Sequence, residues 1–183
     1  IHYLDKTHTT NSKETFNIVF MPGSRLSELK KLFPYFELAY KCLLKKSLNV
    51  SIFIPTLPHL ENIIKNFVKH WEIHTKVTSD TLEIENNFNI ANRALVCSGT
   101  ASLEIAKRNI PQLVIYKLNV ITELILMLLA KTKFANIINI IENKMVIPEL
   151  TNSNLNKNSF MVEFIKLISD EELGANQIKS INS

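Results

Sequence analysis

The stretch that decides the fold is residues 16–25, which read FNIVFMPGSR. Its first six residues are mostly apolar and are bounded by polar residues before them and by Pro22-Gly23 after them, a pattern typical of a buried strand. Residues 94–97 lead into Ser98-Gly99-Thr100 in the same way. Because the chain has only three glycines, two of them directly after strands indicate positions where the backbone closely approaches another group.

A helical pattern follows each of these two turns. Each turn therefore combines the end of a strand, small residues and the N-terminus of a helix, where backbone N–H groups and the positive end of the helix dipole favour an anion. The sequence predicts a phosphate-bearing ligand.

Strand and helix patterns alternate along the chain, which predicts an α/β fold with a Rossmann-like parallel sheet and helices on both faces. Proline at position 34 predicts either a second helix or a kink in the first. Ligands of such sheets bind at the carboxyl ends of the strands, where both turns fall. The strands are expected at 16–21, 50–54, 73–77, 93–97 and 112–116, and the helices at 29–44, 60–68, 101–108 and 120–130, with one short helix between 78 and 92.

Three regions are expected from the composition. Residues 1–15 are polar and are interpreted as the remnant of an upstream region or an interdomain linker, so the chain is expected to be part of a longer protein. Residues 16–150 form the Rossmann-like domain. Residues 151–183 are Asn-rich and are expected to be a polar tail with one amphipathic helix near 160–168.

The charge and the metal-binding residue types exclude several functions. The net charge of +4 is spread along the chain without a basic block, so we expect no nucleic-acid partner. The five histidines lack metal-ligand spacing, so we expect no metal site. No cofactor is expected either. Cys42 and Cys97 are expected to be buried free thiols of a reducing compartment, which suits a cytoplasmic protein. The longest apolar run, residues 124–130, is far shorter than the ~20 residues of a membrane-spanning helix.

The first turn, residues 22–25, allows two interpretations. In one, Gly23 and Ser24 donate backbone N–H groups to a phosphate while Arg25 offers a bidentate fork. In the other, it is an ordinary strand-to-helix turn with a solvated arginine. Neither the GxxxxGK[ST] nor the GxGxxG motif is present.

The second turn and its helix read SGTASLE over residues 98–104. The small residues let a diphosphate reach the amides, the hydroxyls of Ser98 and Thr100 bind it or cap the helix, and Glu104 accepts hydrogen bonds from two ribose hydroxyls. The alternative is an ordinary helix cap with Glu104 complementing the dipole. Two anion-binding turns on one sheet favour a ligand.

The chain resembles the C-terminal half of the bacterial lipid-A-disaccharide synthases. The resemblance rests on four motifs in order and covers residues 16–150: FMPGSR with the following Ser27-Glu28, ALVCSGTASLE from Ala94, the Pro111–Tyr116 strand entry, and Asn139 with VIPEL from Val146. It implies one half of a GT-B glycosyltransferase that transfers 2,3-diacylglucosamine from UDP to 2,3-diacylglucosamine 1-phosphate by inversion and without a metal.

The resemblance also implies the site. Gly23, Ser24 and Arg25 would face the diphosphate, the second turn of Ser98, Gly99 and Thr100 would hold it from the other side, Glu104 would bind the ribose, and Asn139 would line the donor pocket. These residues would stabilise the departing UDP as negative charge develops on its β-phosphate.

Two places depart from the family's pattern. Asn109 replaces a glycine, which is acceptable because asparagine tolerates the left-handed conformation. Residues 142–145 read ENKM where the family has AGRE, so Lys144 loses the arginine fork and Met145 loses the acid. The resemblance assigns the acceptor site and the catalytic carboxylate to an N-terminal half, so no catalytic residue is expected in this chain and the chain alone is expected to be inactive.

Two further functions stay open at this point: another GT-B enzyme of UDP-N-acetylglucosamine, either an epimerase or a lipid-linked transferase, and a non-catalytic module that binds a phosphorylated ligand. The expected partners are a UDP-sugar donor and, through the other half, an acylated glucosamine phosphate. The apolar residues of the 120–130 helix are either core-packed or face a membrane surface at the cytoplasmic side of the bacterial inner membrane. They are Ile121, Leu124, Ile125, Leu128 and Leu129.

Overall fold

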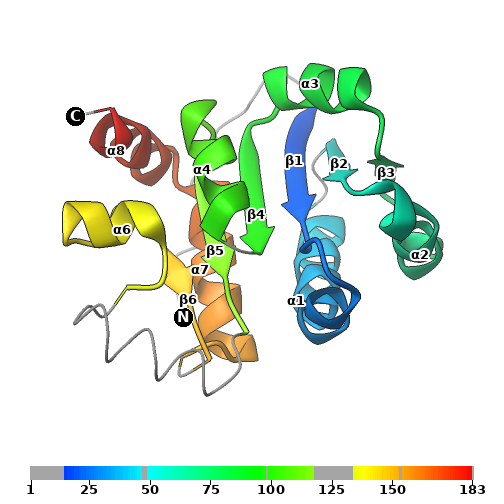
Figure 1. Cartoon of the computed structure of the whole chain (residues 1–183), viewed down its shortest axis with the longest axis horizontal. Helices are drawn as coiled ribbons and strands as arrows, with labels where there is room; N and C mark the ends of the chain where they lie inside the picture. The colour runs from blue at the N-terminus through cyan, green and yellow to red at the C-terminus, as the bar shows by residue number, and fades with distance from the viewer. Residues whose placement is uncertain (1–14, 47–48, 98, 118–133, 153, 183) are drawn as a thin grey trace.

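The structure is a computed structural model that describes residues 15–46, 49–97, 99–117, 134–152 and 154–182. Its centre is a six-stranded sheet in the order β3-β2-β1-β4-β5-β6, and every neighbouring pair is parallel (Figure 1). The strands are β1 (Phe16–Met21), β2 (Val50–Pro55), β3 (His74–Thr78), β4 (Arg93–Cys97), β5 (Gln112–Ile115) and β6 (Glu149–Leu150). The α/β prediction is confirmed, as are the five longer strands; the two-residue strand β6 was not predicted.

Helices cover both faces of this sheet. They are α1 (Leu26–Lys45), α2 (Pro58–Val68), α3 (Thr81–Asn89), α4 (Gly99–Lys107), α6 (Ile137–Glu142), α7 (Lys157–Ser169) and α8 (Glu171–Ile181). In Figure 1, α4 lies in front of β5 and α7 lies behind it. The helix expected at 120–130, with its five apolar residues, lies outside the described residues.

The central strand β1 explains why helices are needed on both sides. Ile18 and Phe20 belong to the apolar cluster beneath α1, α2 and α7, whereas Val19 belongs to the cluster beneath α3 and α4. All three side chains are fully buried. A strand with apolar residues on both faces is typical of a parallel sheet covered by helices, and this is the pattern that the sequence shows.

Helix α1 runs through Pro34 without a break, so the alternative of a second helix starting there is wrong. A proline inside a helix removes one backbone hydrogen bond and costs about 3 kcal/mol. The flanking residues Leu32, Phe33 and Phe36 are buried against the sheet. Their burial, at roughly 1.5–3 kcal/mol per large apolar side chain, offsets that cost.

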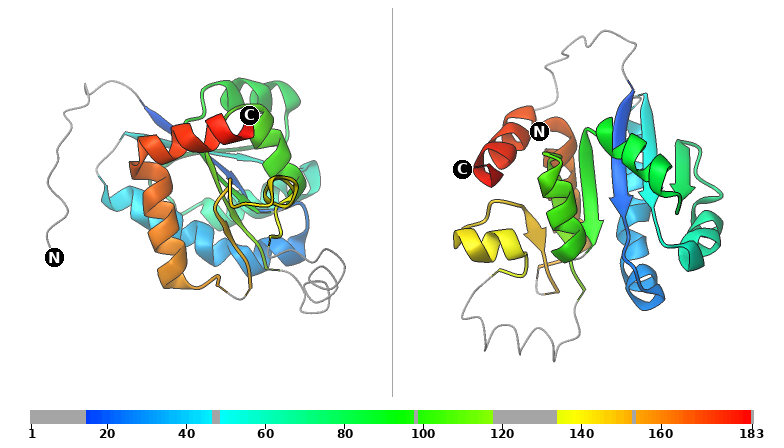
Figure 2. Two further views of the ribbon diagram at one scale, coloured as in Figure 1. Left: turned by 90° about the vertical axis from the view of Figure 1, so that its left-hand side faces the viewer. Right: turned by 45° about the horizontal axis from the view of Figure 1, so that its top comes forward.

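The C-terminal residues form two helices instead of a polar tail with one helix. In α7, Phe160 and Phe164 are fully buried against the sheet, and the capping box of Asn156 and Ser159 begins the helix. Asp170 caps α8 by accepting a hydrogen bond from the N–H of Leu173. Figure 2 shows both helices lying against the rest of the domain. The composition of this region did not indicate the packing, because its many asparagines lie at the surface.

One side chain of α8 forms hydrogen bonds to the sheet. The Gln177 carboxamide accepts a hydrogen bond from the N–H of Gln112 at 2.6 Å and donates one to its carbonyl at 2.9 Å. Gln177 is 3% exposed, so both bonds lie in the interior. The backbone at the start of β5 is thus satisfied by a residue 65 positions later.

Within the described residues no helix is long and apolar enough to cross a membrane. The same part of the chain holds no group of three or more histidine, cysteine or acidic side chains arranged to bind a metal ion.

Candidate functional site

The strand order reverses between β1 and β4. From β1 the chain proceeds to β2 and β3 on one side of the sheet and then crosses to β4 on the other. The two connections leave the carboxyl ends of β1 and β4 in opposite directions, and the crevice between them is the usual ligand site of an open α/β sheet. Both glycine turns that the sequence singled out fall at this crevice.

A pocket of about 370 Å³ occupies the crevice, and we call it the switch-point pocket. Its wall includes the first turn after β1, the segment after β2, one face of α3 and the start of α4. The lining residues are Met21, Gly23, Ser24, Pro55, Thr56, Leu57, Ile84, Phe88, Cys97, Thr100, Ala101 and Glu104. Four of the eight residues expected to bind the ligand, Gly23, Ser24, Thr100 and Glu104, are thereby brought together.

Gly23 is required by its backbone and by its neighbours. Its φ of +112° lies in a region that side chains disfavour. A Cβ atom there would lie 3.1 Å from Oε2 of Glu28 and 3.2 Å from Sγ of Cys97. The sequence predicted that another group lies close to this glycine. Within the chain itself, those groups are the carboxylate of Glu28 and the thiol of Cys97.

Arg25 does not line the switch-point pocket. It is the N-cap residue of α1 and makes no side-chain cap hydrogen bond. Its Nη1 lies 3.2 Å from Oε1 of Glu28, and its side chain is 77% exposed. The structure thus places Arg25 at the rim of the first turn, paired with an acid of its own helix.

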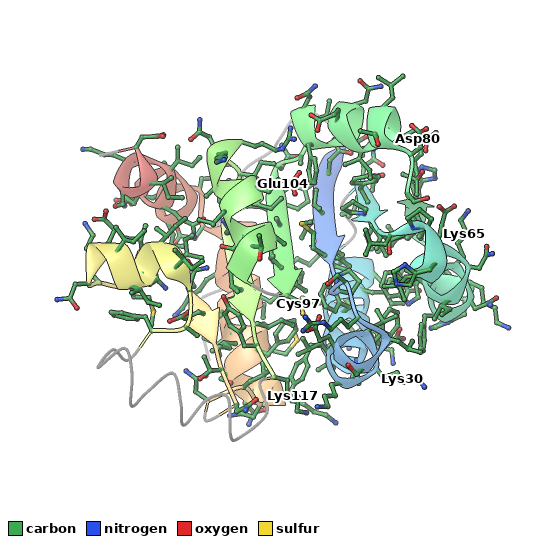
Figure 3. The ribbon with its side chains drawn as sticks, viewed as in Figure 1. Lys30, Lys65, Asp80, Cys97, Glu104 and Lys117 are labelled. Carbon is green, nitrogen blue, oxygen red and sulfur yellow. The ribbon has the colours of Figure 1, made fainter. Side chains whose placement is uncertain are left out.

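The second turn is described from Gly99 onward, where α4 begins; Ser98 lies outside the described residues. The first N–H groups of a helix have no partner within it, so the start of α4 presents donors next to Thr100. Glu104 lies one turn further on, on the side of α4 toward β1 and α3, and Cys97 lies at the end of β4 (Figure 3).

The carboxylate of Glu104 is half exposed and only loosely engaged. Its Oε1 lies 3.6 Å from Nη2 of Arg108. Arg108 is itself held by two hydrogen bonds of 2.7 and 2.9 Å to Glu85, and it stacks over the ring of Phe88 at 4.6 Å. These contacts with Glu85 raise the pKa of Arg108. Glu104 therefore keeps acceptor capacity for a ligand at the pocket wall.

Helix α4 is anchored by buried polar side chains that the sequence did not point to. The side-chain amide of Asn136 donates to Oγ of Ser102 at 2.7 Å, and the side-chain amide of Gln112 donates to the Ser102 carbonyl at 3.0 Å. Glu149 accepts from the N–H groups of Ala135 and Asn136 at 3.0 and 2.6 Å. This network joins α4 to β5, β6 and the start of α6.

Asn139, which was expected to line the donor pocket, is not among the lining residues. Its side chain is fully buried and braces the end of α6: Oδ1 accepts from the N–H groups of Val146 and Ile147, and Nδ2 donates to the Ile147 carbonyl. The four hydrogen-bonding positions of its amide are largely used within the chain. Of the following residues, Lys144 pairs with Glu142 at 3.7 Å.

Asn109 and Asn143 stand where the family pattern has glycine, and both have a positive φ, 55° and 50° respectively. The prediction that asparagine adopts the left-handed conformation at position 109 is confirmed. At position 143 the same conformation forms the C-cap of α6.

Both cysteines are free, with Cys97 buried and Cys42 half-buried, so the expectation of two buried thiols holds fully for Cys97 alone. Burial, with a smaller effect from the charge of Glu28, raises the pKa of Cys97 to about 12. This thiol, which lines the pocket, therefore stays protonated and unreactive at neutral pH.

The described lining residues include one charged side chain, Glu104, and no lysine or arginine. An anion in the pocket would therefore depend on backbone N–H groups and hydroxyls, with Arg25 as the nearby cation of the first turn. The remaining wall, formed by Leu57, Ile84 and Phe88, is apolar and suits a flat ring.

The family model and the curated relatives that match the sequence agree on one family. The family model described as lipid-A-disaccharide synthetase matches residues 4–182. Lipid-A-disaccharide synthase of Gluconobacter oxydans is 30% identical over 156 residues, which are 85% of this chain and 38% of that protein. The enzyme of Rickettsia prowazekii is 32% identical over 157 residues, which are 85% of this chain and 41% of that protein. The chain thus spans about two fifths of the length of the curated relatives that it matches.

Solved structures show the same fold at low sequence identity. A putative UDP-N-acetylglucosamine 2-epimerase from Listeria monocytogenes has a TM-score of 0.59 at 14% identity and is covered over 40% of its length by 90% of this chain. The S. aureus MnaA–UDP co-structure has a TM-score of 0.57 at 17% identity, with 91% of this chain and 40% of that one covered. The C-terminal domain of a group 1 glycosyl transferase, LpcC, from Francisella tularensis has a TM-score of 0.54 at 14% identity, with 91% and 82% covered. The fold is that of one half of a GT-B protein.

Proposed function

The chain belongs to the lipid-A-disaccharide synthetase family, and on that premise we propose that it is the half of a lipid-A-disaccharide synthase that binds the nucleotide of the sugar donor. The whole enzyme would transfer 2,3-diacylglucosamine from its UDP derivative to 2,3-diacylglucosamine 1-phosphate and release UDP. The observation that carries the proposal is the switch-point pocket, which unites the Gly23 turn and the first turn of α4 at one point of the sheet.

The polar part of the pocket would hold the diphosphate. The backbone N–H groups at the start of α4 and the hydroxyls of Ser24 and Thr100 are donors on both sides of the crevice, and the helix N-terminus favours negative charge. As the bond to the sugar breaks, negative charge grows on the β-phosphate. Donors fixed in place before the reaction stabilise that charge without reorganising, which is how this half would contribute to the rate.

The rest of the pocket would hold the nucleoside. Glu104 would accept hydrogen bonds from the two ribose hydroxyls, since its carboxylate reaches the pocket and is engaged only at 3.6 Å with Arg108. The apolar wall of Leu57, Ile84 and Phe88 would cover the face of the uracil ring. Apolar walls with a few placed polar groups are typical of small-molecule sites.

The other half of the enzyme would bind the acceptor sugar and supply the catalytic base, across the cleft that two GT-B halves form. The acyl chains of both sugars favour a bilayer, so the whole enzyme would act at the cytoplasmic face of the inner membrane. This chain would supply donor binding and leaving-group stabilisation, with no metal in either role.

The direct test is calorimetric titration of the chain with UDP, with NAD as the comparison ligand. We expect a dissociation constant of roughly 1 mM for UDP, which at ten times that concentration raises the free energy of unfolding by about 1.4 kcal/mol. NAD should give no thermal shift. A shift with NAD and none with UDP would contradict the proposal.

A pair of matched variants localises the binding. Thr100→Glu adds a negative charge in the first turn of α4, where it favours the helix but repels a diphosphate. Thr81→Glu adds the same charge in the first turn of α3, whose residue 81 does not line the pocket. Both variants should keep the melting temperature, and only Thr100→Glu should abolish UDP binding. Equal UDP affinity in the two variants would remove the α4 N-terminus from the site.

A further inference from the structure

The first turn already contains an anion. The carboxylate of Glu28 lies against Gly23: a Cβ atom on that glycine would meet Oε2 of Glu28 at 3.1 Å and its Cβ at 3.3 Å. The other oxygen, Oε1, lies 3.2 Å from Nη1 of Arg25. Glu28 is thus the residue for which the Gly23 turn makes room, and it also holds the arginine of that turn.

This arrangement is unfavourable for an anionic ligand in two ways. The negative charge of Glu28 stands beside the turn where a diphosphate would lie. Its partner Arg25 is turned to the rim and is absent from the pocket wall, which has no other lysine or arginine among its described residues.

We propose that Glu28 is a positioning residue of the donor site: it holds Arg25 outside the pocket until a diphosphate takes the arginine over, and its own charge lowers the affinity for an anion that binds beside it. The inference rests on the proposed function, because it concerns the same pocket and the same ligand.

The exchange of partners is physically easy. Arg25 and Glu28 form a three-residue-spaced pair on the surface of α1, with 77% of the arginine side chain exposed. Such exposed pairs are worth at most about 1 kcal/mol. A diphosphate carries more charge than one carboxylate and accepts the planar guanidinium through two parallel hydrogen bonds, so it competes well for the arginine.

The effect of Glu28 on affinity follows from the competition for Arg25. A neutral sugar does not attract the guanidinium of Arg25 away from Glu28, so it forms no ion pair at this turn. A diphosphate gains the arginine but must bind beside the Glu28 carboxylate, so part of its affinity is lost. Removing the charge of Glu28 while keeping its shape should therefore strengthen diphosphate binding.

The experiment measures UDP affinity by calorimetry in the wild-type chain, Glu28→Gln, Arg25→Gln and the double variant. The control is Glu163→Gln, which removes the same charge from another three-residue-spaced pair, with Lys166 on α7, away from the switch-point pocket. We expect Glu28→Gln to bind UDP at least threefold more tightly than wild type, and Glu163→Gln to change the affinity by less than 1.5-fold. The gain should shrink at 0.5 M salt, because salt screens exposed charges.

The double variant tests the exchange itself. The gain from Glu28→Gln should be smaller when Arg25 is already glutamine, because no arginine is then released. Unchanged or weaker UDP binding by Glu28→Gln at an unchanged melting temperature overturns the inference. So does a gain of the same size in the presence and absence of Arg25.

The outcomes separate this inference from the proposed function. Wild type that binds UDP, together with a Glu28→Gln variant that binds no better, removes the inference and leaves the function standing. Absence of UDP binding in every variant, with NAD binding instead, removes both. Glu28→Ala should also bind UDP more tightly than wild type. It replaces Glu28→Gln in the experiment if Glu28→Gln does not fold.

Discussion

The side-chain amide of Asn136 donates a hydrogen bond to the hydroxyl of Ser102 across 2.7 Å, and both side chains are almost completely buried. Ser102 lies on α4 between Thr100 and Glu104, the two residues of that helix whose side chains carry polar groups into the pocket wall. The contact therefore fixes the first turns of α4 through a residue that does not line the switch-point pocket.

Ser102→Ala should lower the free energy of unfolding by about 1–3 kcal/mol, because the amide of Asn136 loses its acceptor inside the protein. At this chain length the loss corresponds to a fall in melting temperature of about 2–4 °C per kcal/mol. Ser169→Ala is the control, since that serine accepts a hydrogen bond from Lys46 at the surface. Equal melting temperatures for the two variants would show that the buried bond contributes nothing.

Glu104→Gln should weaken UDP binding by about 1.5–3 kcal/mol, because the amide has one acceptor where the carboxylate has two and no charge to strengthen the bonds. Stability should change by no more than about 1 kcal/mol, the contribution of an exposed acid to the helix dipole. Glu85→Gln is the matched control, since Glu85 is an exposed carboxylate that contacts the same Arg108 from outside the pocket. A stability loss in Glu104→Gln without a loss of affinity would leave Glu104 with a capping role only.

Arg25→Lys should weaken UDP binding although the charge is kept, because a lysine cannot offer the planar fork to two phosphate oxygens. Arg93→Lys provides the contrast. Arg93 donates from Nε to the Leu167 carbonyl at 2.9 Å, so its replacement should lower the melting temperature and leave UDP affinity unchanged. Equal UDP affinities of Arg25→Lys and wild type would make Arg25 an ordinary surface residue.

Stability at acid pH should depend on Glu61. Hydrogen bonds from Lys65 and Ser79 lower the pKa of Glu61 from 4.5 to about 2. A carboxyl whose pKa is lower in the folded state stabilises the protein above its unfolded value, and this contribution is lost as the pH falls from about 4.5 toward 2. The melting temperature of wild type should therefore exceed that of Glu61→Gln at pH 6, and the two should converge near pH 2. A constant difference between the variants from pH 6 to pH 2 would contradict this account.

Much of this fold is legible in the sequence because parallel strands buried on both faces are continuous apolar runs. Residues 93–97 were predicted with the bounds of β4, and β1 with its own. Strand β6 was not predicted because a strand of two residues is too short to show a periodic pattern. Helix α6 was not predicted either, because it has only six residues. Its N-cap, Asn136, also depends on contacts that only the folded chain makes.

The position of the pocket was predictable because backbone turns define it. Gly23 and Gly99 mark turns that a sequence displays, and the parallel sheet brings them together. The direction of a side chain is not displayed in this way. Arg25 turns to Glu28 and Asn139 turns inward to the 146–147 backbone, and both outcomes depend on neighbours that only the folded chain supplies.

The hydrogen bonds between Gln177 and the backbone of Gln112 bear on where this domain ends. The Gln177 carboxamide, which belongs to α8, forms with Gln112 the two hydrogen bonds that a neighbouring strand would otherwise form. Any version of the domain cut before residue 177 would leave the N–H and the carbonyl of Gln112 unsatisfied in the interior, and the side chain of that same residue holds α4 through Ser102. Helix α8, none of whose residues lines the switch-point pocket, is therefore linked to α4 through Gln112, and shortening the chain there would loosen α4 at the pocket wall.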